Sequence, residues 1–562
     1  MKKLIELDIL GMTCNGCSSH IERDLNNANG VINSSVNHRT GKGNFEINDS
    51  VISKSEVINK VNNIGKYEVK KDLLSNTNEL VETEFPKREE TGNYDYDLII
   101  IGGGSAAFSA MTTANDLGKS VLLINGGLEL GGTCVNVGCV PSKHLIRAAE
   151  SIHKASFSPF NGIKTNAPDI DFTRIIKDKR LLVNEMREKK YLKVANSVNN
   201  VTIIEGWSNF IDERTVEVNN KTYTASKFLI STGATTSIPQ IEGLTNIGYL
   251  TNSTLFDLEE KPESLTILGA GYIGLEIAQA FSRLGVKIRI LEFTNRVLST
   301  QSQDISDELQ KQLLNEGIDF YPNIRVEKLE KIGNQIKIYA SNPNGELVEF
   351  IENGQIVIST GTAPNTSKMN IEKSGVKLTK TGHIEVNNKQ ETNVSHIFAA
   401  GDCTNTPAFV YTAATEGKYA VSNAFGTDNT YTSDYSALPW VVFTDPQVAG
   451  VGLDEDEAKA KGIPFESTKL PLDEVPRALA ALDTRGFIKL IRNTETDKLI
   501  GARVVAPEGG ELIMEAVLAI KYGISASELA ETFHPYLTLG EGIKIAAITF
   551  KKDISELSCC AT

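Results

Sequence analysis

Six of the seven cysteines in this chain of 562 residues fall in close pairs. The pairs are Cys14 with Cys17, Cys134 with Cys139, and Cys559 with Cys560, while Cys403 stands alone. Seven cysteines are too few to staple a chain of this length by disulfides, and close thiol pairs in a reducing compartment are typical of metal-binding or redox-active sites. The spacing therefore predicts thiol chemistry at three places, and we assign no chemistry to the lone cysteine.

The middle pair, Cys134 and Cys139, lies in the run GGTCVNVGCVPSK at residues 131–143. Five positions along a regular helix rise about 7.5 Å, which is too far for a disulfide whose Cα atoms normally lie within about 7 Å. A bond between the two therefore requires a distorted first helical turn, which Gly138 and the glycines that open the run permit. Thiolates near a helix N-terminus have lowered pKa values, which suits redox work. Two buried structural thiols are the less favoured alternative.

The first pair, Cys14 and Cys17, lies in the run GMTCNGC, between a predicted strand and a predicted helix. This spacing lets both sulfurs converge on one ion, and two thiolates select soft metal ions. A thioredoxin-like redox motif is the rival interpretation. We disfavour it because the motif follows the first strand of a unit of only about 70 residues.

The last pair, Cys559 and Cys560, is adjacent and lies close to the end of the chain. A disulfide between neighbouring residues is strained, because it closes a small ring against the trans preference of the peptide bond. Two thiols on a terminal tail are better suited to pass a soft metal on by stepwise exchange of thiolates. The alternative is that the pair is incidental.

Two other segments of the chain each combine a predicted strand with a glycine-rich turn. The apolar runs at residues 98–101 and 265–268 each lead directly into a glycine-rich turn. The small residues of the turns are Gly102, Gly104 and Ala107 in the first, and Gly269, Gly271 and Gly274 in the second. In this fingerprint they permit the tight turn, the close approach of a pyrophosphate, and the packing of helix on strand. The pattern predicts two dinucleotide-binding domains.

The residues that would bind ribose differ between the two units. The strand at residues 121–124 ends in Asn125, where this fold usually has an acidic residue, so the first site lacks a charged partner for the ribose. The strand at residues 288–291 ends in Glu292, which suits the ribose of NADH and would repel the 2′-phosphate of NADPH. Arg296 lies close in sequence and is expected to offset that repulsion.

The N-terminal unit is predicted to be ferredoxin-like. Ile5, Leu7 and Ile9 alternate as in a strand, and Ser53 with Glu56 forms a capping-box pattern that opens a helix. With the other apolar segments, the order of elements is βαββαβ. The whole chain is therefore expected to be α/β, with two Rossmann-like domains, an α+β C-terminal domain and this small ferredoxin-like domain in front.

We expect the following boundaries. The small N-terminal domain with the first cysteine pair spans 1–70, a polar linker 71–93, the first dinucleotide-binding domain 94–260 and 386–437, the second dinucleotide-binding domain 261–385, and the C-terminal domain with its cysteine tail 438–562. The net charge of −14 argues against a nucleic-acid partner, and no run of about 18 apolar residues predicts membrane insertion. Glu6 and Asp8 interrupt the first apolar run, so we expect a cytoplasmic protein rather than an exported one.

From Tyr94 onward the chain resembles the FAD-dependent pyridine nucleotide-disulfide oxidoreductases. The resemblance rests on the run at residues 131–143, on Ala400-Gly401-Asp402, and on the turns Thr232-Gly233 and Thr360-Gly361. It implies FAD as cofactor in the domain 94–260 and 386–437 and a nicotinamide in the domain 261–385, with Cys139 against the flavin and Cys134 facing the exchange partner. The flavin contacts it implies, beyond the first glycine turn, are Gly127, Thr133, Lys143, Ala234, Asp402 and Val410.

The N-terminal motif resembles heavy-metal-associated domains, and the whole arrangement resembles the mercuric reductase family. Further similar runs lie at residues 475–479, 535–538, 541–544 and 557–560, and Tyr191 and Tyr536 match tyrosines that line the metal site. This implies reduction of mercury(II), delivered as thiol complexes, to elemental mercury, with all three cysteine pairs as ligands. It also implies NADPH, a homodimer in which one subunit's tail serves the other's site and the α+β C-terminal domain is the dimerisation domain, and a membrane mercury transporter as donor of mercury(II).

The sequence departs from these families at two places. His534-Pro535 resembles the acid-base histidine of glutathione and lipoamide reductases, but the glutamate expected five positions later is Leu539, and the next glutamate is Glu541. We therefore expect His534 to lack an orienting carboxylate and to be a poor proton shuttle. The second departure is that Phe293, after Glu292, replaces a basic residue, which leaves NADH possible.

Two other functions remain open. A lipoamide- or glutathione-type reductase with a fused metal domain would turn over organic disulfides and need His534. A copper or zinc carrier would bind metal without metal-dependent NAD(P)H oxidation.

Overall fold

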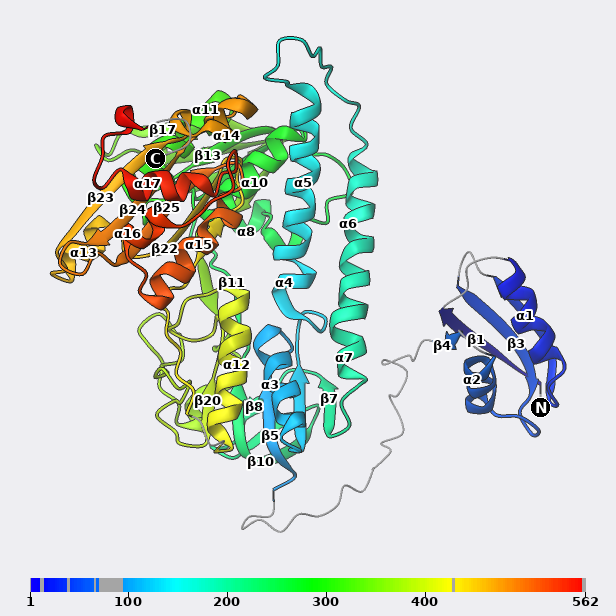
Figure 1. Ribbon diagram of the computed structural model, residues 1–562. Helices are drawn as coiled ribbons and strands as arrows, with labels where there is room; N and C mark the ends of the chain where they lie inside the picture. The colour runs from blue at the N-terminus through cyan, green and yellow to red at the C-terminus, as the bar shows by residue number, and fades with distance from the viewer. Residues whose placement is uncertain are drawn as a thin grey trace. The chain divides into compact units, whose positions relative to one another are not determined.

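A computed structural model describes residues 2–10, 15–37, 41–64, 67–69, 94–426 and 430–557. The chain forms two compact units, residues 1–91 and 92–562, which we describe separately (Figure 1). Among the described residues, no helix has the length and apolar content needed to cross a bilayer.

The N-terminal unit is one antiparallel sheet with two helices, and its sheet order is β2-β3-β1-β4. Its elements are β1 Lys2–Leu10, α1 Asn15–Asn26, β2 Val31–Asn37, β3 Lys42–Asn48, α2 Lys54–Asn63 and β4 Glu68–Val69. Ile5, Leu7 and Ile9 are buried on one face of β1, and Ser53 and Glu56 form the expected capping box. The predicted βαββαβ order is confirmed.

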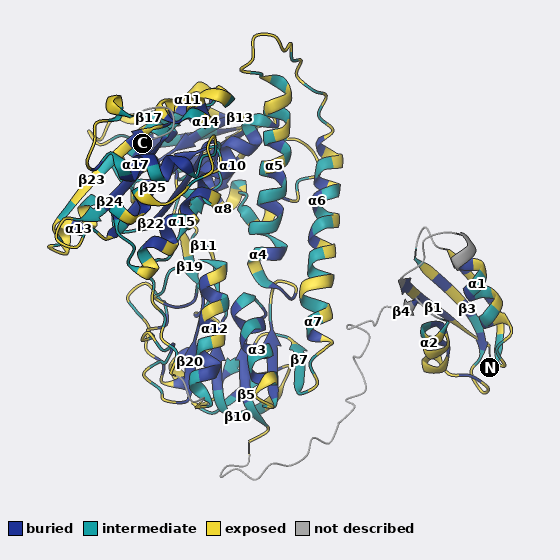
Figure 2. Cartoon of the chain, in the orientation of Figure 1, coloured by how far each residue is buried: buried dark blue, intermediate teal, exposed yellow. Residues whose placement is uncertain are grey.

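The first sheet of the main unit has a parallel core, with the order β7-β6-β5-β10 and with β20 beside β10. Its strands are β5 Tyr96–Ile101, β6 Val121–Asn125, β7 Val201–Glu205, β8 Asn209–Phe210, β9 Thr215–Val218, β10 Lys221–Ile230 and β20 Ile397–Ala399. Helices α3 Ser105–Asp116 and α12 Val410–Ala424 pack against each other beside it. The last four residues of β5 and the last three of β10 are buried (Figure 2).

The second parallel sheet has the order β14-β13-β12-β18. Its strands are β12 Ser264–Leu268, β13 Lys287–Leu291, β14 Asp319–Tyr321 and β18 Gln355–Ile358, with helices α10 Tyr272–Arg283 and α11 Gln303–Asn315. An antiparallel three-stranded sheet of β15 Arg325–Ile332, β16 Gln335–Ser341 and β17 Leu347–Glu352 is inserted before β18. The short strands β11 Ala234–Thr236 and β19 Thr362–Pro364 pair where the chain enters and leaves this region.

The C-terminal part is a five-stranded antiparallel sheet with the order β21-β22-β25-β24-β23. Its strands are β21 Trp440–Val442, β22 Gln447–Gly452, β23 Phe465–Pro471, β24 Phe487–Asn493 and β25 Leu499–Ala506. Its helices are α13 Glu455–Ala460, α14 Pro476–Ala481, α15 Gly509–Tyr522, α16 Ala526–Glu531 and α17 Glu541–Ile548, with the short turns η3 Leu472–Glu474 and η4 Ile554–Glu556.

Two long helices, α5 Cys139–Ser156 and α6 Phe172–Arg187, lie side by side in the main unit (Figure 1). The remaining elements are α4 Gly132–Asn136, η1 Glu188–Leu192, α7 Lys193–Ala195, α8 Leu244–Ile247, α9 Asn252–Leu255 and η2 Ile371–Ser374. Helix α5 also packs against α10 of the second nucleotide region, so it links the two parallel sheets.

Candidate functional site

The cysteine pair lies at a break between two helices. Helix α4 ends at Asn136, and α5 begins at Cys139 after Gly138, whose backbone lies at φ −120° and ψ −108°, outside the helical region. Gly131 and Gly132 take the left-handed backbone that opens α4. The predicted distortion between the two cysteines is therefore confirmed, and both side chains are partly buried.

The pKa values of the two thiols are shifted in opposite directions. The Cys134 thiol donates a hydrogen bond to the Cys139 sulfur, which lowers the pKa of Cys139 to about 7 against the effect of burial, and the charge of Lys143 lowers it further. The same hydrogen bond and burial raise the pKa of Cys134. Above about pH 7 the reduced pair therefore holds a thiolate at Cys139 and a thiol at Cys134. A thiolate is the form that attacks disulfides and binds soft metal ions.

An ion pair with the buried carboxylate of Glu276 holds Lys143 beside the cysteines. Lys143 Nζ lies 2.7 Å from Glu276 Oε2 and 4.3 Å from the ring centre of Phe443. The other oxygen of Glu276 accepts a hydrogen bond of 3.0 Å from the backbone N–H of Phe443. Sequence reasoning missed Glu276. The available signal was a carboxylate on the buried face of α10, two residues after Gly274.

Tyr191 lies at the same site. It sits in η1, a single π-helical turn at the end of α6, and its ring packs edge-on against Phe108 at 4.9 Å. Burial raises the pKa of Tyr191, and Cys134 and Cys139 lie close enough to raise it further. A π-turn shifts the helical register by one residue and is common at functional sites. The structure thus brings the predicted tyrosine to the cysteine pair.

The first glycine turn forms a cradle that fits FAD. Gly102 has φ +121°, and a Cβ there would collide with the backbone oxygen of Ser231. Gly104 caps α3, and a Cβ there would meet only the Cα of Gly132 at 3.8 Å, so the turn is open where a pyrophosphate would approach. Ala107 is fully buried against the strand.

The other residues of the implied flavin site lie in several further elements of the main unit. Asp402 lies after β20, and burial raises the pKa of its carboxyl. Val410 opens α12, and in the same first turn the hydroxyl of Thr412 is buried without a hydrogen-bond partner, as expected where a polar cofactor atom completes the site. Gly127 follows β6 and Thr133 lies in α4, and both are exposed. Ala234, in β11, is partly exposed.

Cys403 is fully buried, and burial raises the pKa of its thiol to about 11.

Asn125, at the end of β6, is hydrogen-bonded to neighbouring residues through its side chain. Its side-chain amide donates hydrogen bonds of 2.9 Å to a carboxylate oxygen of Glu205 and to the backbone oxygen of Leu128. Glu205 ends β7, the neighbouring parallel strand, directly opposite Asn125. Sequence reasoning missed Glu205, because only the strand order shows that residue 205 reaches the end of β6.

The second glycine turn also has the shape of a nucleotide cradle. Gly269 has φ +106°, a Cβ on Gly271 would meet no atom within 4 Å, and Gly274 packs against the backbone of Gly269. Glu292 is buried, and it accepts hydrogen bonds from the backbone N–H of Ala270 at 2.5 Å and of Thr294 at 2.6 Å.

Arg296 does not offset the charge of Glu292 in the way that the sequence suggested. Its guanidinium donates to the backbone oxygens of Ser299 at 3.1 Å and Gln301 at 2.9 Å. Phe293, which follows Glu292 after β13, is 62% exposed. The guanidinium of Arg325 lies 4.9 Å from the centre of its ring.

His534 corrects a second expectation. Its Nε2 atom lies 2.7 Å from Oε1 of Glu515 on α15, so the histidine has a carboxylate partner, although not the one five positions later. Glu541 instead accepts a hydrogen bond of 3.2 Å from the backbone N–H of Leu537. The prediction that His534 lacks an orienting carboxylate was wrong, because its partner Glu515 lies on α15 and not in the segment that follows the histidine.

Tyr536 lies away from the cysteines of its own chain. It is 52% exposed on the loop between α16 and α17. The next three residues line a cavity with the far end of α5, from Ile152 onward, and a helix rise of 1.5 Å per residue places that end roughly 20 Å from Cys139. Cys14, Cys559 and Cys560 lie outside the described residues, and Cys17 lies in the first turn of α1.

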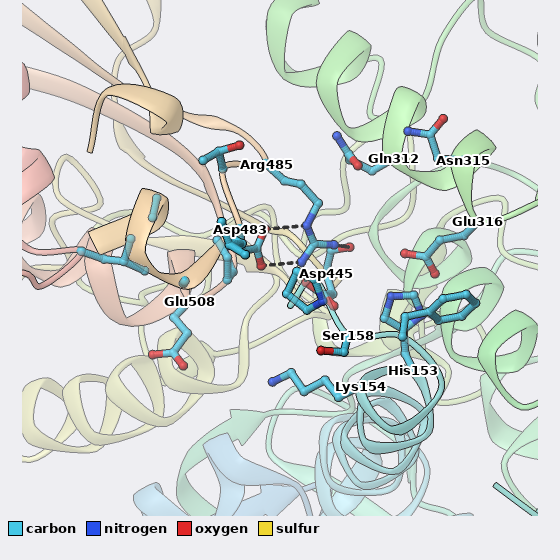
Figure 3. Close-up of a pocket in the computed structure, with 18 of the residues that line it drawn as sticks. His153, Lys154, Ser158, Gln312, Asn315, Glu316, Asp445, Asp483, Arg485 and Glu508 are labelled. Carbon is cyan, nitrogen blue, oxygen red and sulfur yellow. Dashed lines mark hydrogen bonds and ion pairs between the residues drawn. The ribbon is translucent and has the colours of Figure 1, made fainter. Parts of the chain in front are cut away.

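This cavity has a volume of about 1070 Å³ and lies among α5, α10, α11 and the C-terminal part (Figure 3). Two of its arginines are paired with carboxylates. Arg283 pairs with Asp445 at 2.9 Å, and Arg485 pairs with Asp445 at 2.8 Å and with Asp483 at 2.7 Å. Its lining contains no cysteine, so it is not the candidate redox site.

Comparisons with known proteins agree with this geometry. Residues 96–417 match the pyridine nucleotide-disulphide oxidoreductase family, residues 438–547 match its dimerisation domain, and residues 6–67 match the heavy-metal-associated domain. A mercuric reductase of Lysinibacillus sphaericus is 40% identical over 99% of both chains, and one of Staphylococcus aureus is 38% identical over 99% of both.

Among solved structures, the HOCl-induced flavoprotein disulfide reductase RclA from Escherichia coli is similar. Its TM-score is 0.73 at 28% identity, and the match covers 81% of this chain and all of that one.

Proposed function

Because the chain belongs to the mercuric reductase family of pyridine nucleotide-disulphide oxidoreductases, we propose that it reduces mercury(II) to elemental mercury with electrons from NAD(P)H. The observation that carries this proposal is the thiolate–thiol pair of Cys139 and Cys134, flanked by Lys143 and Tyr191. A soft ion between two sulfurs there displaces the remaining proton, and the bound ion takes two electrons and leaves as the neutral atom.

When held by the turn of Gly102, Gly104 and Ala107, a flavin would supply two-electron transfer from the nicotinamide to the cysteine site. The residues of this chain hold and expose the reactive groups. Lys143 keeps positive charge beside Cys139, and Glu276 holds Lys143 in place. The overall change consumes one NAD(P)H and one mercury(II) and releases NAD(P)+, one proton and one mercury atom.

We propose a homodimer in which Tyr536 and the tail cysteines serve the partner subunit's site. Tyr536 is half exposed and far from the cysteines of its own chain, and Phe533 beside it is 98% exposed. An exposed aromatic surface of this kind is typical of a subunit interface, and the matched dimerisation domain supports it.

The outer cysteine pairs complete the proposal. Cys14 and Cys17 collect mercury(II) from cellular thiols or from a membrane transporter, and Cys559 and Cys560 pass it to Cys134 and Cys139 by thiolate exchange. The match to the heavy-metal-associated domain supports the first of these roles. We place these reactions in the cytoplasm, where thiols remain reduced.

The nicotinamide is a separate proposal. Resemblance implies NADPH, whereas Glu292 and Phe293 favour NADH, because the strand end presents a buried carboxylate and Arg296 donates to backbone oxygens instead. We propose that the enzyme accepts both and uses NADH more efficiently.

The test mixes the holoenzyme with excess thiol, mercury(II) and either nicotinamide. Volatile mercury must appear together with nicotinamide oxidation, and Cys134→Ser with Cys139→Ser must abolish both. Replacing Cys559 and Cys560 by serine must slow the reaction with bulky thiol complexes. Absence of volatile mercury from the wild-type enzyme would overturn the proposal, and turnover of lipoamide or glutathione disulfide alone would favour a disulfide reductase.

A further inference from the structure

The ribose end of the first nucleotide cradle contains a carboxylate that the fingerprint of this fold does not predict. In such folds an acidic residue normally ends the second strand and binds the ribose hydroxyls. Here Asn125 occupies that position, and an amide makes weaker hydrogen bonds than a carboxylate because it carries no charge.

Glu205 stands directly across from Asn125. Strands β6 and β7 are parallel and in register at these two residues, so both side chains leave the sheet at the edge where the Gly102 turn begins. The amide of Asn125 donates to both carboxylate oxygens of Glu205, at 2.9 and 3.2 Å. Asn125 therefore holds the Glu205 carboxylate in place at the end of β7.

The surroundings of Glu205 leave it able to accept further hydrogen bonds. A carboxylate has about four acceptor sites, and within the described part of the chain both hydrogen bonds to the Glu205 side chain come from the one amide group of Asn125. Burial raises the pKa of Glu205, the hydrogen bond from Asn125 opposes this rise, and Glu129 adds to it. Hydroxyl donors would stabilise the charged form at this position.

We propose that Glu205, oriented by Asn125, is the residue that binds the adenosine ribose of the FAD. The carboxylate that this fold usually carries on the second strand is supplied here by the third strand of the same edge. The inference rests on the proposed use of FAD, but not on mercury as the substrate.

The experiment measures FAD affinity by titrating apoprotein with FAD and following the quenching of flavin fluorescence. Glu205→Gln is expected to raise the dissociation constant about tenfold or more, because the hydroxyls lose a charged acceptor. Glu217→Gln, on β9 of the same sheet, is the matched control and is expected to leave the affinity unchanged. Thermal unfolding of the apoproteins checks that both variants fold.

A second variant separates a ligand role from a structural one. Asn125→Asp combined with Glu205→Gln moves the carboxylate to the usual strand and keeps the pair hydrogen-bonded, so FAD affinity should return to within about threefold of the wild type. An unchanged dissociation constant for Glu205→Gln would overturn the inference, as would a double variant as weak as the single one. Absence of mercury turnover in the wild-type enzyme at full FAD occupancy would instead count against the proposed function.

Discussion

The Nε2 atom of His534 lies 2.7 Å from Oε1 of Glu515, which precedes it by 19 residues. This pair joins α15 to the loop before α17 and lies in the C-terminal part, away from the cysteines of its own chain. Reduction of a thiolate-bound metal ion needs no proton at the metal, so we expect Glu515→Gln and His534→Asn to keep mercury turnover within about twofold. Each should lower the free energy of unfolding by about 1 kcal/mol.

Urea unfolding of both single variants and the double variant measures their coupling. A double variant as stable as either single one would show that the pair acts as a unit. Loss of mercury turnover in His534→Asn, with the flavin still bound, would contradict this prediction and favour acid-base chemistry at that residue.

The second prediction concerns the Cys139 thiolate, whose pKa is lowered to about 7 first by the Cys134 thiol and then by Lys143. In the reduced enzyme, thiolate absorbance near 240 nm should rise as the pH increases through about 7. Cys134→Ala should move this midpoint up by removing the hydrogen-bond donor, and Lys143→Gln should move it up less.

Lys154→Gln is the control for this titration, because Lys154 lies at the far end of the same helix and pairs with Glu150. It should leave the midpoint where it is. A midpoint that Cys134→Ala does not move would show that the thiolate is not the one at Cys139.

The third prediction concerns Gly132, whose left-handed backbone brings it against the first glycine turn. An alanine Cβ at Gly132 would lie 2.7 Å from the Cα of Gly104 and force the cysteine loop away from the cradle. Gly333→Ala is the matched control, since Gly333 has φ +61° against +65° and open space around it. Both variants carry the conformational cost of about 1 kcal/mol, but only Gly132→Ala should lose FAD on gel filtration.

The fourth prediction concerns Tyr191. Tyr191→Phe should lower mercury turnover about tenfold, by removing a polar group beside the metal-binding thiols, and should leave reduction of the flavin by NADH unchanged in stopped-flow absorbance. Tyr223→Phe, on β10, is the control. If flavin reduction slows as much as turnover, Tyr191 acts on the cofactor rather than on the metal.

The fifth prediction concerns nicotinamide choice. Phe293→Arg places a cation at the strand end beside Glu292, and it should raise the ratio of kcat/KM for NADPH to that for NADH about tenfold. Leu347→Arg, an exposed position on β17 of the same region, adds the same charge elsewhere and should leave the ratio unchanged. Wild-type enzyme that already prefers NADPH would contradict the role given to Glu292.

Local patterns predicted the two glycine turns and the break at the cysteines well, because each depends on residues a few positions apart. Leu98 to Ile101 are apolar and buried, so a strand follows from composition, and the glycines behind them admit only a turn. The same holds for the capping box at Ser53.

The partners of single polar groups could not be predicted in this way. Glu515 meets His534 only through the packing of α15, and Glu205 meets Asn125 only because β7 lies beside β6. The π-turn that carries Tyr191 depends on a one-residue change in helical hydrogen bonding, which no periodicity in the sequence records. Long-range geometry, rather than residue type, decides each of these.

The position of β20 beside β10 has a consequence for synthesis on the ribosome. The sheet that holds the first cradle needs residues 397–399, and α12 adds residues up to 424, although β10 ends at residue 230. At about 5–20 residues per second, roughly 10–40 s pass between the emergence of these segments. The inserted sheet β14-β13-β12-β18 is therefore complete before the first parallel sheet can close. A nascent chain that ends before β20 still lacks one strand of the sheet that leads into the first glycine turn.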